Sequence, residues 1–93
     1  MTDRSLRVKN IMSRIDELAS VSEDGNNITR RYGTAAAVEA GKKVLEWMVE
    51  AGLTARVDAI GNVRGVLRAA AAGANVKTLV IASHIDTVVN AGR

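Results

Sequence analysis

The chain predicts an α/β fold in which two helices and a β-hairpin precede a buried central strand. The first half carries apolar residues at helical spacing, and the middle alternates between apolar and polar residues. Near the end, residues 79–82 form a continuous apolar run rich in β-branched side chains, which is typical of a strand covered on both faces in a parallel sheet. One central strand with a hairpin leaves the sheet incomplete.

Two amphipathic helices are predicted from apolar residues that recur every three or four positions. The first covers residues 6–19, and Ser5 is its expected N-cap. The second covers residues 34–52, with Thr34 as the expected N-cap. Gly52 is expected to end this helix in the left-handed conformation that favours glycine.

A β-hairpin is predicted after the second helix. Residues 54–59 alternate between apolar and polar side chains, and a second run covers residues 63–68. Gly61 and Asn62 supply the turn between them. Gly65, inside the second run, indicates either a bulge or a close approach of another part of the chain.

Two loops separate these elements. Residues 20–33 form a long one that contains Thr29, Arg30 and Arg31, and residues 69–75 form an alanine-rich surface connection. Long loops inside compact domains are often functional. We favour the simpler interpretation that both arginines are exposed and keep the loop solvated, and a binding role stays open.

Composition and charge exclude several classes of protein. The net charge is +3, but the basic residues are scattered among the acidic ones, with no aromatic interleaving, so no nucleic-acid partner is expected. The lack of cysteine excludes disulfides and zinc-thiolate sites. No apolar stretch is long enough to span a membrane and no signal peptide is recognisable, so we expect a cytoplasmic protein without a membrane partner. A chain of 93 residues without phenylalanine has a thin core, which predicts marginal stability.

The predicted central strand, residues 77–83, leads directly to His84, the only histidine, with Asp86 two positions later. Side chains two apart in an extended segment point the same way, so the two could act on one site at the carboxyl end of the strand. Histidine is the commonest metal ligand, and its second N–H is usually given to a carboxylate or carbonyl. The spacing alone nevertheless favours a satisfied polar pair, and no nucleophile motif supports a hydrolytic triad.

The wider context resembles a known family. The stretch from Ala82 to Arg93, which contains His84 and Asp86, is similar to the first metal-binding motif of zinc-dependent amidohydrolases. That family includes N-carbamoyl-L-amino-acid hydrolases, allantoate amidohydrolases and β-ureidopropionases, and it is related to the zinc aminopeptidases. Three further stretches match in the same order: Ile28-Thr29-Arg30, Trp47-Met-x-x-Ala-Gly52-Leu, and Asp58-Ala-Ile-Gly61-Asn62-Val-Arg-Gly65.

The resemblance implies a fold, a site and a partner. Residues 1–93 would form the N-terminal segment of a zinc-peptidase-like catalytic domain, without the dimerisation domain through which the family forms homodimers. It implies that His84 is a ligand to one ion of a two-metal centre of zinc or manganese, and that Asp86 orients the imidazole. The substrate would be a small molecule with a ureido or amide C–N bond, of the N-carbamoyl amino acid or allantoate type.

The sequence therefore leaves two functions open. In the first, the chain is a segment of a metal-dependent hydrolase and is inactive alone, because a catalytic zinc site normally needs three protein ligands. In the second, it is a non-catalytic α/β module that binds itself or a partner through exposed strand edges. Substrate choice stays open between the two substrate types.

Overall fold

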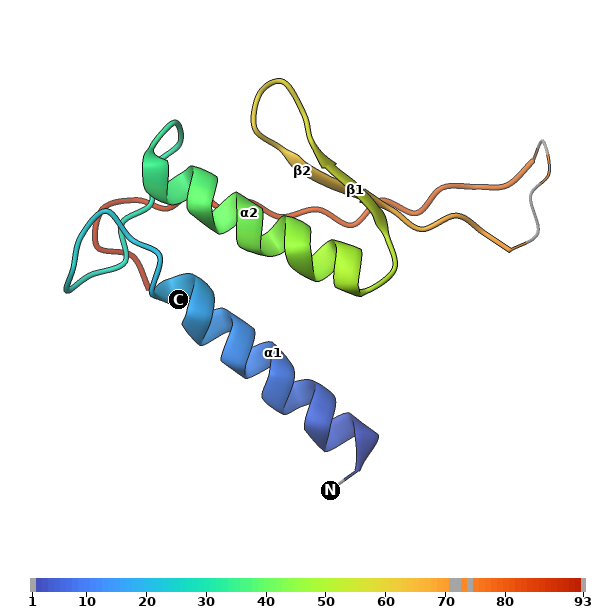
Figure 1. Cartoon of the computed structure of the whole chain (residues 1–93), viewed down its shortest axis with the longest axis horizontal. Coiled ribbons are helices and arrows are strands. Elements are labelled where there is room, and N and C mark those ends of the chain that lie inside the picture. The colour runs from blue at the N-terminus through green and yellow to red at the C-terminus, as the bar shows by residue number, and fades with distance from the viewer. Residues whose placement is uncertain (1, 71–72, 74, 93) are drawn as a thin grey trace. The chain divides into compact units, whose positions relative to one another are not determined.

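The computed structural model describes residues 2–70, 73 and 75–92 of the chain. Two helices, α1 (Asp3–Ala19) and α2 (Ala35–Glu50), precede two strands, β1 (Thr54–Val57) and β2 (Val63–Val66), as Figure 1 shows. The strands pair only with each other, in antiparallel orientation. The prediction of two helices followed by a hairpin is confirmed.

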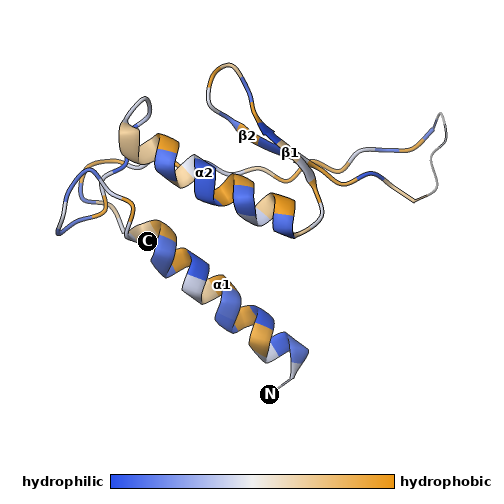
Figure 2. Cartoon of the chain, viewed as in Figure 1, coloured by the Kyte–Doolittle hydropathy of each residue, from blue (hydrophilic) through white to orange (hydrophobic). Residues whose placement is uncertain are grey.

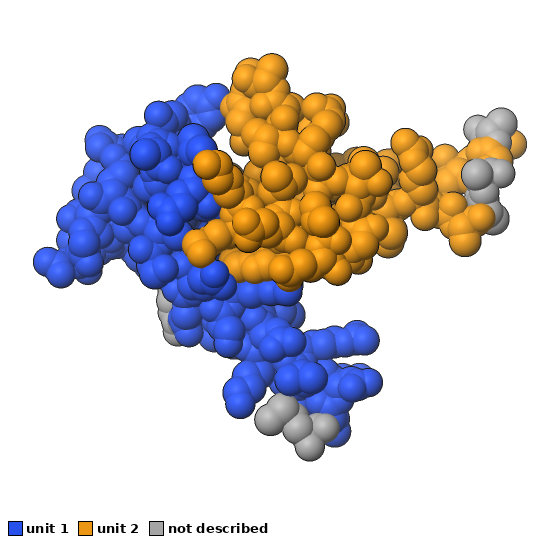
Figure 3. Space-filling view, in the orientation of Figure 1, with its two compact units in different colours: residues 1–40, 85–93 blue, residues 41–84 orange. Residues whose placement is uncertain are grey.

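The chain divides into two compact units, which Figure 3 distinguishes by colour. Unit 1 contains Met1–Ala40 together with Ile85–Arg93, and unit 2 contains Gly41–His84. Helix α2 begins in unit 1 and continues into unit 2. Segments from both ends of the sequence therefore share one unit.

Helix α1 begins earlier than the sequence indicates. Its N-cap is Thr2, whose backbone is extended with ψ 159° and whose hydroxyl oxygen accepts a hydrogen bond from the backbone N–H of Ser5. The prediction that Ser5 caps this helix is wrong, because the Thr2 hydroxyl already satisfies that N–H and the helix starts one turn sooner. Asp3 lies in the first turn, where a negative charge interacts favourably with the helix dipole.

Apolar and polar residues alternate along α1, as the colours of Figure 2 show, and the apolar ones recur at helical spacing, yet no residue of α1 is buried. Val8, Ile11 and Met12 are 55%, 57% and 43% exposed. An amphipathic helix in a globular protein normally covers such a stripe with another element. In the part of the chain that the structure describes, this stripe stays largely exposed.

The hydrophobic core of unit 1 is small and combines residues from the end of α1, the loop after it, the start of α2 and the C-terminal segment. Val21, Ala36 and Ala40 are buried, and the half-buried Leu18 and Ile85 pack against them. Alanine methyl groups bury little apolar area, so this cluster contributes less than a core of leucine and phenylalanine would. Polar contacts therefore carry a larger share of the stability of unit 1.

Both predicted caps of α2 are confirmed. The Thr34 hydroxyl oxygen accepts a hydrogen bond of 3.2 Å from the N–H of Ala37. At the other end Gly52 has φ 91°, and the N–H groups of Gly52 and Leu53 donate to the carbonyls of Val49 and Met48, both at 3.0 Å. This pair of hydrogen bonds is the Schellman arrangement, which glycine allows at no steric cost.

The hairpin of unit 2 has a register that runs from Thr54 opposite Val66 to Val57 opposite Val63. An added Cβ at Gly65 would lie 2.7 Å from Leu53 Cδ2 and 2.8 Å from Met48 Sδ. The close approach predicted at Gly65 is therefore confirmed. Glycine lets the side chains of Met48 and Leu53 lie directly against the backbone of β2.

The prediction of a buried central strand at residues 77–83 is wrong for this structure. The described residues of this segment form no strand, and Leu79, Val80 and Ile81 are 85%, 77% and 89% exposed. A central parallel strand needs a neighbouring strand on each side to pair its N–H and C=O groups. The strands described here, β1 and β2, pair with each other and not with residues 77–83. The predicted connection at residues 69–75 falls partly outside the described residues, because it includes 71, 72 and 74.

Within residues 2–70, 73 and 75–92, no helix has the length and hydropathy that crossing a membrane requires.

Two glycines of unit 2 are predicted to respond to substitution with opposite signs. An added Cβ at Gly41 would lie 3.5 Å from Val63 Cγ2, an ordinary contact, so Gly41→Ala should raise the free energy of unfolding by about 1 kcal/mol through helix propensity. Gly65→Val should lower it by about 1–3 kcal/mol, because a branched side chain cannot fit against Met48 and Leu53. Urea denaturation followed by circular dichroism measures both, and equal effects of the two substitutions would contradict the packing described here.

Candidate functional site

The Thr29-Arg30 step is the most buried polar feature among the described residues. Thr29 is 4% exposed and Arg30 is 6% exposed. The interpretation that both loop arginines are solvated is therefore wrong for Arg30. A buried guanidinium costs several kcal/mol unless its N–H groups are hydrogen-bonded, so its partners decide whether it can be retained.

The partners of the Arg30 guanidinium are backbone carbonyls from two parts of unit 1. Nη1 donates to the oxygens of Leu18 and Val21, at 2.9 and 2.8 Å, and Nε donates to the oxygen of Ile85 at 3.1 Å. Burial lowers the pKa of Arg30 from its ordinary value, but an arginine stays charged in proteins. The planar fork thereby joins the end of α1 to the segment that follows His84.

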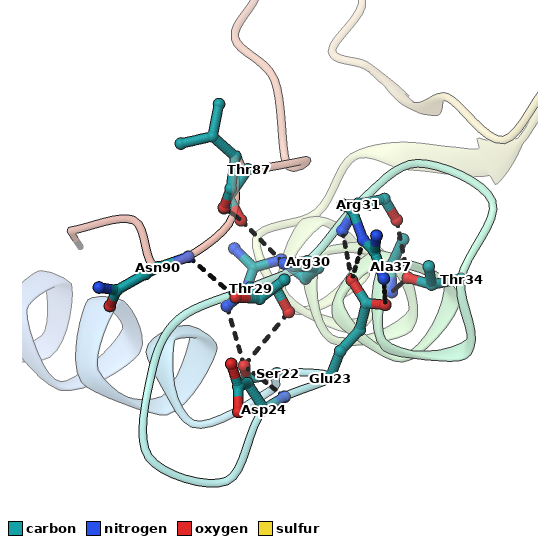
Figure 4. Close-up of polar contacts among 11 residues, drawn as sticks. Ser22, Glu23, Asp24, Thr29, Arg30, Arg31, Thr34, Ala37, Thr87 and Asn90 are labelled. Atoms are coloured by element: carbon teal, nitrogen blue, oxygen red, sulfur yellow. Dashed lines mark hydrogen bonds and ion pairs between the residues drawn. The ribbon is translucent and has the colours of Figure 1, made fainter.

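The backbone of residues 28–30 also pairs with the C-terminal segment, partly as Figure 4 shows. Arg30 N–H donates to Thr87 Oγ1 at 2.8 Å, and Thr87 N–H donates to the Arg30 carbonyl at 2.7 Å. Asn90 N–H donates to Thr29 Oγ1 at 2.9 Å, while Ala91 N–H donates to the Ile28 carbonyl at 2.7 Å. These contacts join residues about sixty positions apart in the sequence.

The loop that carries Thr29 is itself held by Ser22 and Glu23. Ser22 Oγ accepts from Thr29 N–H at 2.9 Å, and Glu23 N–H donates to the Thr29 carbonyl at 2.7 Å. At Asn90 the backbone adopts φ 54°, a left-handed conformation that asparagine tolerates better than most residues.

The sequence alone does not indicate the contacts that Thr87 and Asn90 make with residues 29 and 30. The match of Ile28-Thr29-Arg30 to a family motif was the available signal, but it did not reveal which residues they contact.

Arg31 has an environment unlike that of Arg30. It is exposed, and its Nε and Nη2 donate to the two carboxylate oxygens of Glu23, at 3.1 and 2.8 Å. The side-chain hydrogen bond from Arg31 lowers the pKa of Glu23 to about 2, with a smaller contribution from the backbone N–H of Arg31. For Arg31, the predicted exposure is confirmed.

His84 and Asp86 are both exposed, whereas Ile85 and Thr87 are half-buried. Alternating exposure is what extended backbone produces, because successive side chains point to opposite sides. In the described part of the chain, no group of three or more His, Cys, Asp or Glu side chains could hold a metal ion. These residues therefore do not form a complete metal site, and the assignments of His84 as a metal ligand and Asp86 as its helper stay predictions.

The Asp58 motif forms the turn of the hairpin in unit 2. Asp58 Oδ1 accepts from the N–H groups of Ile60 and Asn62, at 3.1 and 2.9 Å, and Oδ2 accepts from Asn62 Nδ2 at 3.0 Å. The side-chain hydrogen bond from Asn62 makes the largest contribution to the lowered pKa of Asp58. Gly61, with φ 92°, completes the turn. The spacing of this motif is thus explained by local turn geometry.

Comparison with known proteins identifies several relatives. Allantoate deiminase 2 from Glycine max is 41% identical over 81 residues, which cover 87% of this chain and 16% of the relative. Allantoate deiminase from Arabidopsis thaliana is 35% identical over 82 residues, or 88% of this chain and 15% of the relative. N-carbamoyl-L-amino-acid amidohydrolase from Paenarthrobacter aurescens is 30% identical over 92 residues, or 99% of this chain and 22% of the relative.

The chain thus spans less than a quarter of the length of these curated relatives. No protein-family model matches it, and no solved structure matches it with significance. The shared sequence defines the chain as part of a hydrolase family. It belongs to the family of allantoate deiminases and N-carbamoyl-L-amino-acid amidohydrolases, as its motifs predict.

The pKa of Glu23 provides a test of the loop geometry. Because this pKa is lower in the folded chain, the stabilisation from the ion pair is present above the ordinary value of 4.5 and is lost as the pH falls toward about 2. Titration of the Glu23 side-chain carbon by NMR should give a pKa of about 2. In Arg31→Met the pKa should return toward 4.5, since the donor is gone. Titration near 4.5 in the unaltered chain would show that the pair does not form.

Proposed function

We propose that the chain forms part of the catalytic domain of a hydrolase that cleaves a ureido or amide C–N bond in a small molecule. The observation that carries the proposal is the similarity to the amidohydrolase from Paenarthrobacter aurescens, which covers 92 of the 93 residues and so includes both His84 and Asp86. The names of the relatives favour allantoate or an N-carbamoyl amino acid as the substrate type.

In this proposal His84 contributes one ligand to a metal centre of zinc or manganese. A neutral imidazole is the form that binds a metal, and a carboxylate that accepts its other N–H fixes the tautomer and the ring orientation. Asp86 is the candidate for that carboxylate. Because the described residues hold no group of three possible ligands, the other ligands must come from elsewhere, and the chain alone is expected to be inactive.

One observation supports a second candidate function, that of a self-associating or partner-binding module. Residues 79–81 are almost fully exposed and apolar, and they have a composition typical of strands. An unpaired segment of this kind can add a strand from another chain. The same exposure also suits a segment that pairs within a longer hydrolase, so activity is the property that separates the two functions.

The test of the proposed hydrolase is a chimera. The matching segment of the Glycine max allantoate deiminase is replaced by this chain, and ammonia release from allantoate and N-carbamoyl amino acids is measured together with the metal content. We predict that the chimera retains activity, that Asp86→Asn lowers it about 10–100-fold, and that His84→Ala lowers it at least about 100-fold with loss of metal.

Lys77→Ala is the matched control, because Lys77 is exposed in the same segment and has no role in the proposed site. It should leave both activity and metal content unchanged. A folded chimera in which His84→Ala keeps full activity and full metal content would contradict the proposal. Activity that survives only in the parent enzyme, with a folded but inactive chimera, would favour the binding module.

A further inference from the structure

We propose that Arg30 is a positioning residue, which holds the backbone on both sides of Asp86 in place. The inference rests on the proposed function, because that function is what gives Asp86 a role at the site. Arg30 acts through the backbone of Ile85 and Thr87, the two neighbours of Asp86 in the sequence. It would therefore affect the site without contacting substrate.

The contacts of one residue reach the chain on each side of Asp86. On the first side, Arg30 Nε donates to the Ile85 carbonyl at 3.1 Å. On the second, Arg30 N–H donates to Thr87 Oγ1 at 2.8 Å and the Arg30 carbonyl accepts from Thr87 N–H at 2.7 Å. Ile85 and Thr87 are half-buried by this arrangement, and Asp86 between them is exposed.

The anchor is itself fixed at the end of α1. Arg30 Nη1 donates to the carbonyls of Leu18 and Val21, so the planar guanidinium has acceptors on two elements at once. A lysine ammonium is a point charge on a flexible stem and cannot reproduce that fork. The position of the Ile85 carbonyl is thus tied to helix α1 by a rigid group.

A second set of contacts fixes the far end of the same segment. Asn90 N–H donates to Thr29 Oγ1, and Ala91 N–H donates to the Ile28 carbonyl. Residues 85–91 therefore cannot shift along residues 28–30 without breaking hydrogen bonds at both ends. We call this arrangement the 28–30/85–91 pairing. It holds the backbone near Asp86 in one position relative to residues 28–30.

A buried arginine could instead serve only to stabilise unit 1. In that case its loss would weaken hydrogen bonds throughout unit 1 to the same extent. A positioning role predicts a larger local effect at residues 85–91 than in helix α2. Thr87 N–H is the informative probe, because its acceptor is the backbone carbonyl of Arg30, which every variant retains.

The experiment is amide hydrogen exchange by NMR on the 93-residue chain, comparing Thr87 and Ala91 with Ala40 in helix α2. In Arg30→Met, exchange at Thr87 should become at least about tenfold faster relative to Ala40, because buried carbonyls lose their donors. Arg30→Lys should give an intermediate increase. The heteronuclear NOE of Asp86 should fall in the same order, as its backbone becomes mobile on the fast timescale.

Three further variants keep the result interpretable. Arg31→Met alters the exposed neighbour of Arg30 and should leave the ratio of Thr87 to Ala40 exchange unchanged. Val38→Gly weakens α2 at a position that is 58% exposed, so it should speed exchange at Ala40 more than at Thr87 and change the ratio in the opposite direction from Arg30→Met. Thr87→Val removes the Oγ1 acceptor and should loosen the segment even if Arg30→Met does not fold. An unchanged ratio in the Arg30 and Thr87 variants, or parallel increases at Thr87 and Ala40, would overturn the proposal. These rates require no substrate, so such a result would leave the proposed hydrolase function to stand or fall on the chimera.

Discussion

The buried guanidinium of Arg30, with its hydrogen bonds to the carbonyls of Leu18, Val21 and Ile85, is the interaction on which unit 1 depends. The apolar cluster of this unit contains small side chains and cannot by itself hold residues 85–91 in place. Hydrogen bonds to a charged group contribute about 1.5–3 kcal/mol each, which together is comparable with the several kcal/mol that burial of the charge costs. Loss of the Arg30 guanidinium would leave these three carbonyls without that donor. Displacement of the carbonyls would leave a buried charge without its acceptors.

The features that follow from local chemistry could be predicted from the sequence. Thr34 and Gly52 define the ends of α2 because a cap depends only on residues within a turn of it. The hairpin follows from alternation and from the Asp58 turn, whose hydrogen bonds all lie within a few residues. The error at Ser5 is of the same local kind, since Thr2 is also a good N-cap and lies one turn earlier.

The features that depend on distant residues could not be predicted in this way. The apolar run at residues 79–81 has the composition of a central strand, but a strand requires partners, and the described strands β1 and β2 pair with each other. Arg30 is buried and Arg31 is exposed, although the two are neighbours in the sequence. The burial of Arg30 depends on contacts that include Ile85 and Thr87, more than fifty positions away. The family motifs marked His84 and Asp86 as candidates, and the structure adds the 28–30/85–91 pairing that borders them.

The 28–30/85–91 pairing requires an Arg30 guanidinium that is buried and hydrogen-bonded to the backbone that flanks the candidate site. The most direct measurement is the exchange rate of the arginine Nε protons in the unaltered chain by NMR, with Arg31 as the exposed reference. Because Arg30 Nε–H is buried and donates to the Ile85 carbonyl, its proton should exchange much more slowly than that of Arg31 and should show NOE contacts to Ile85. An Arg30 Nε proton that exchanges as fast as the Arg31 proton, without contacts to Ile85, would contradict it.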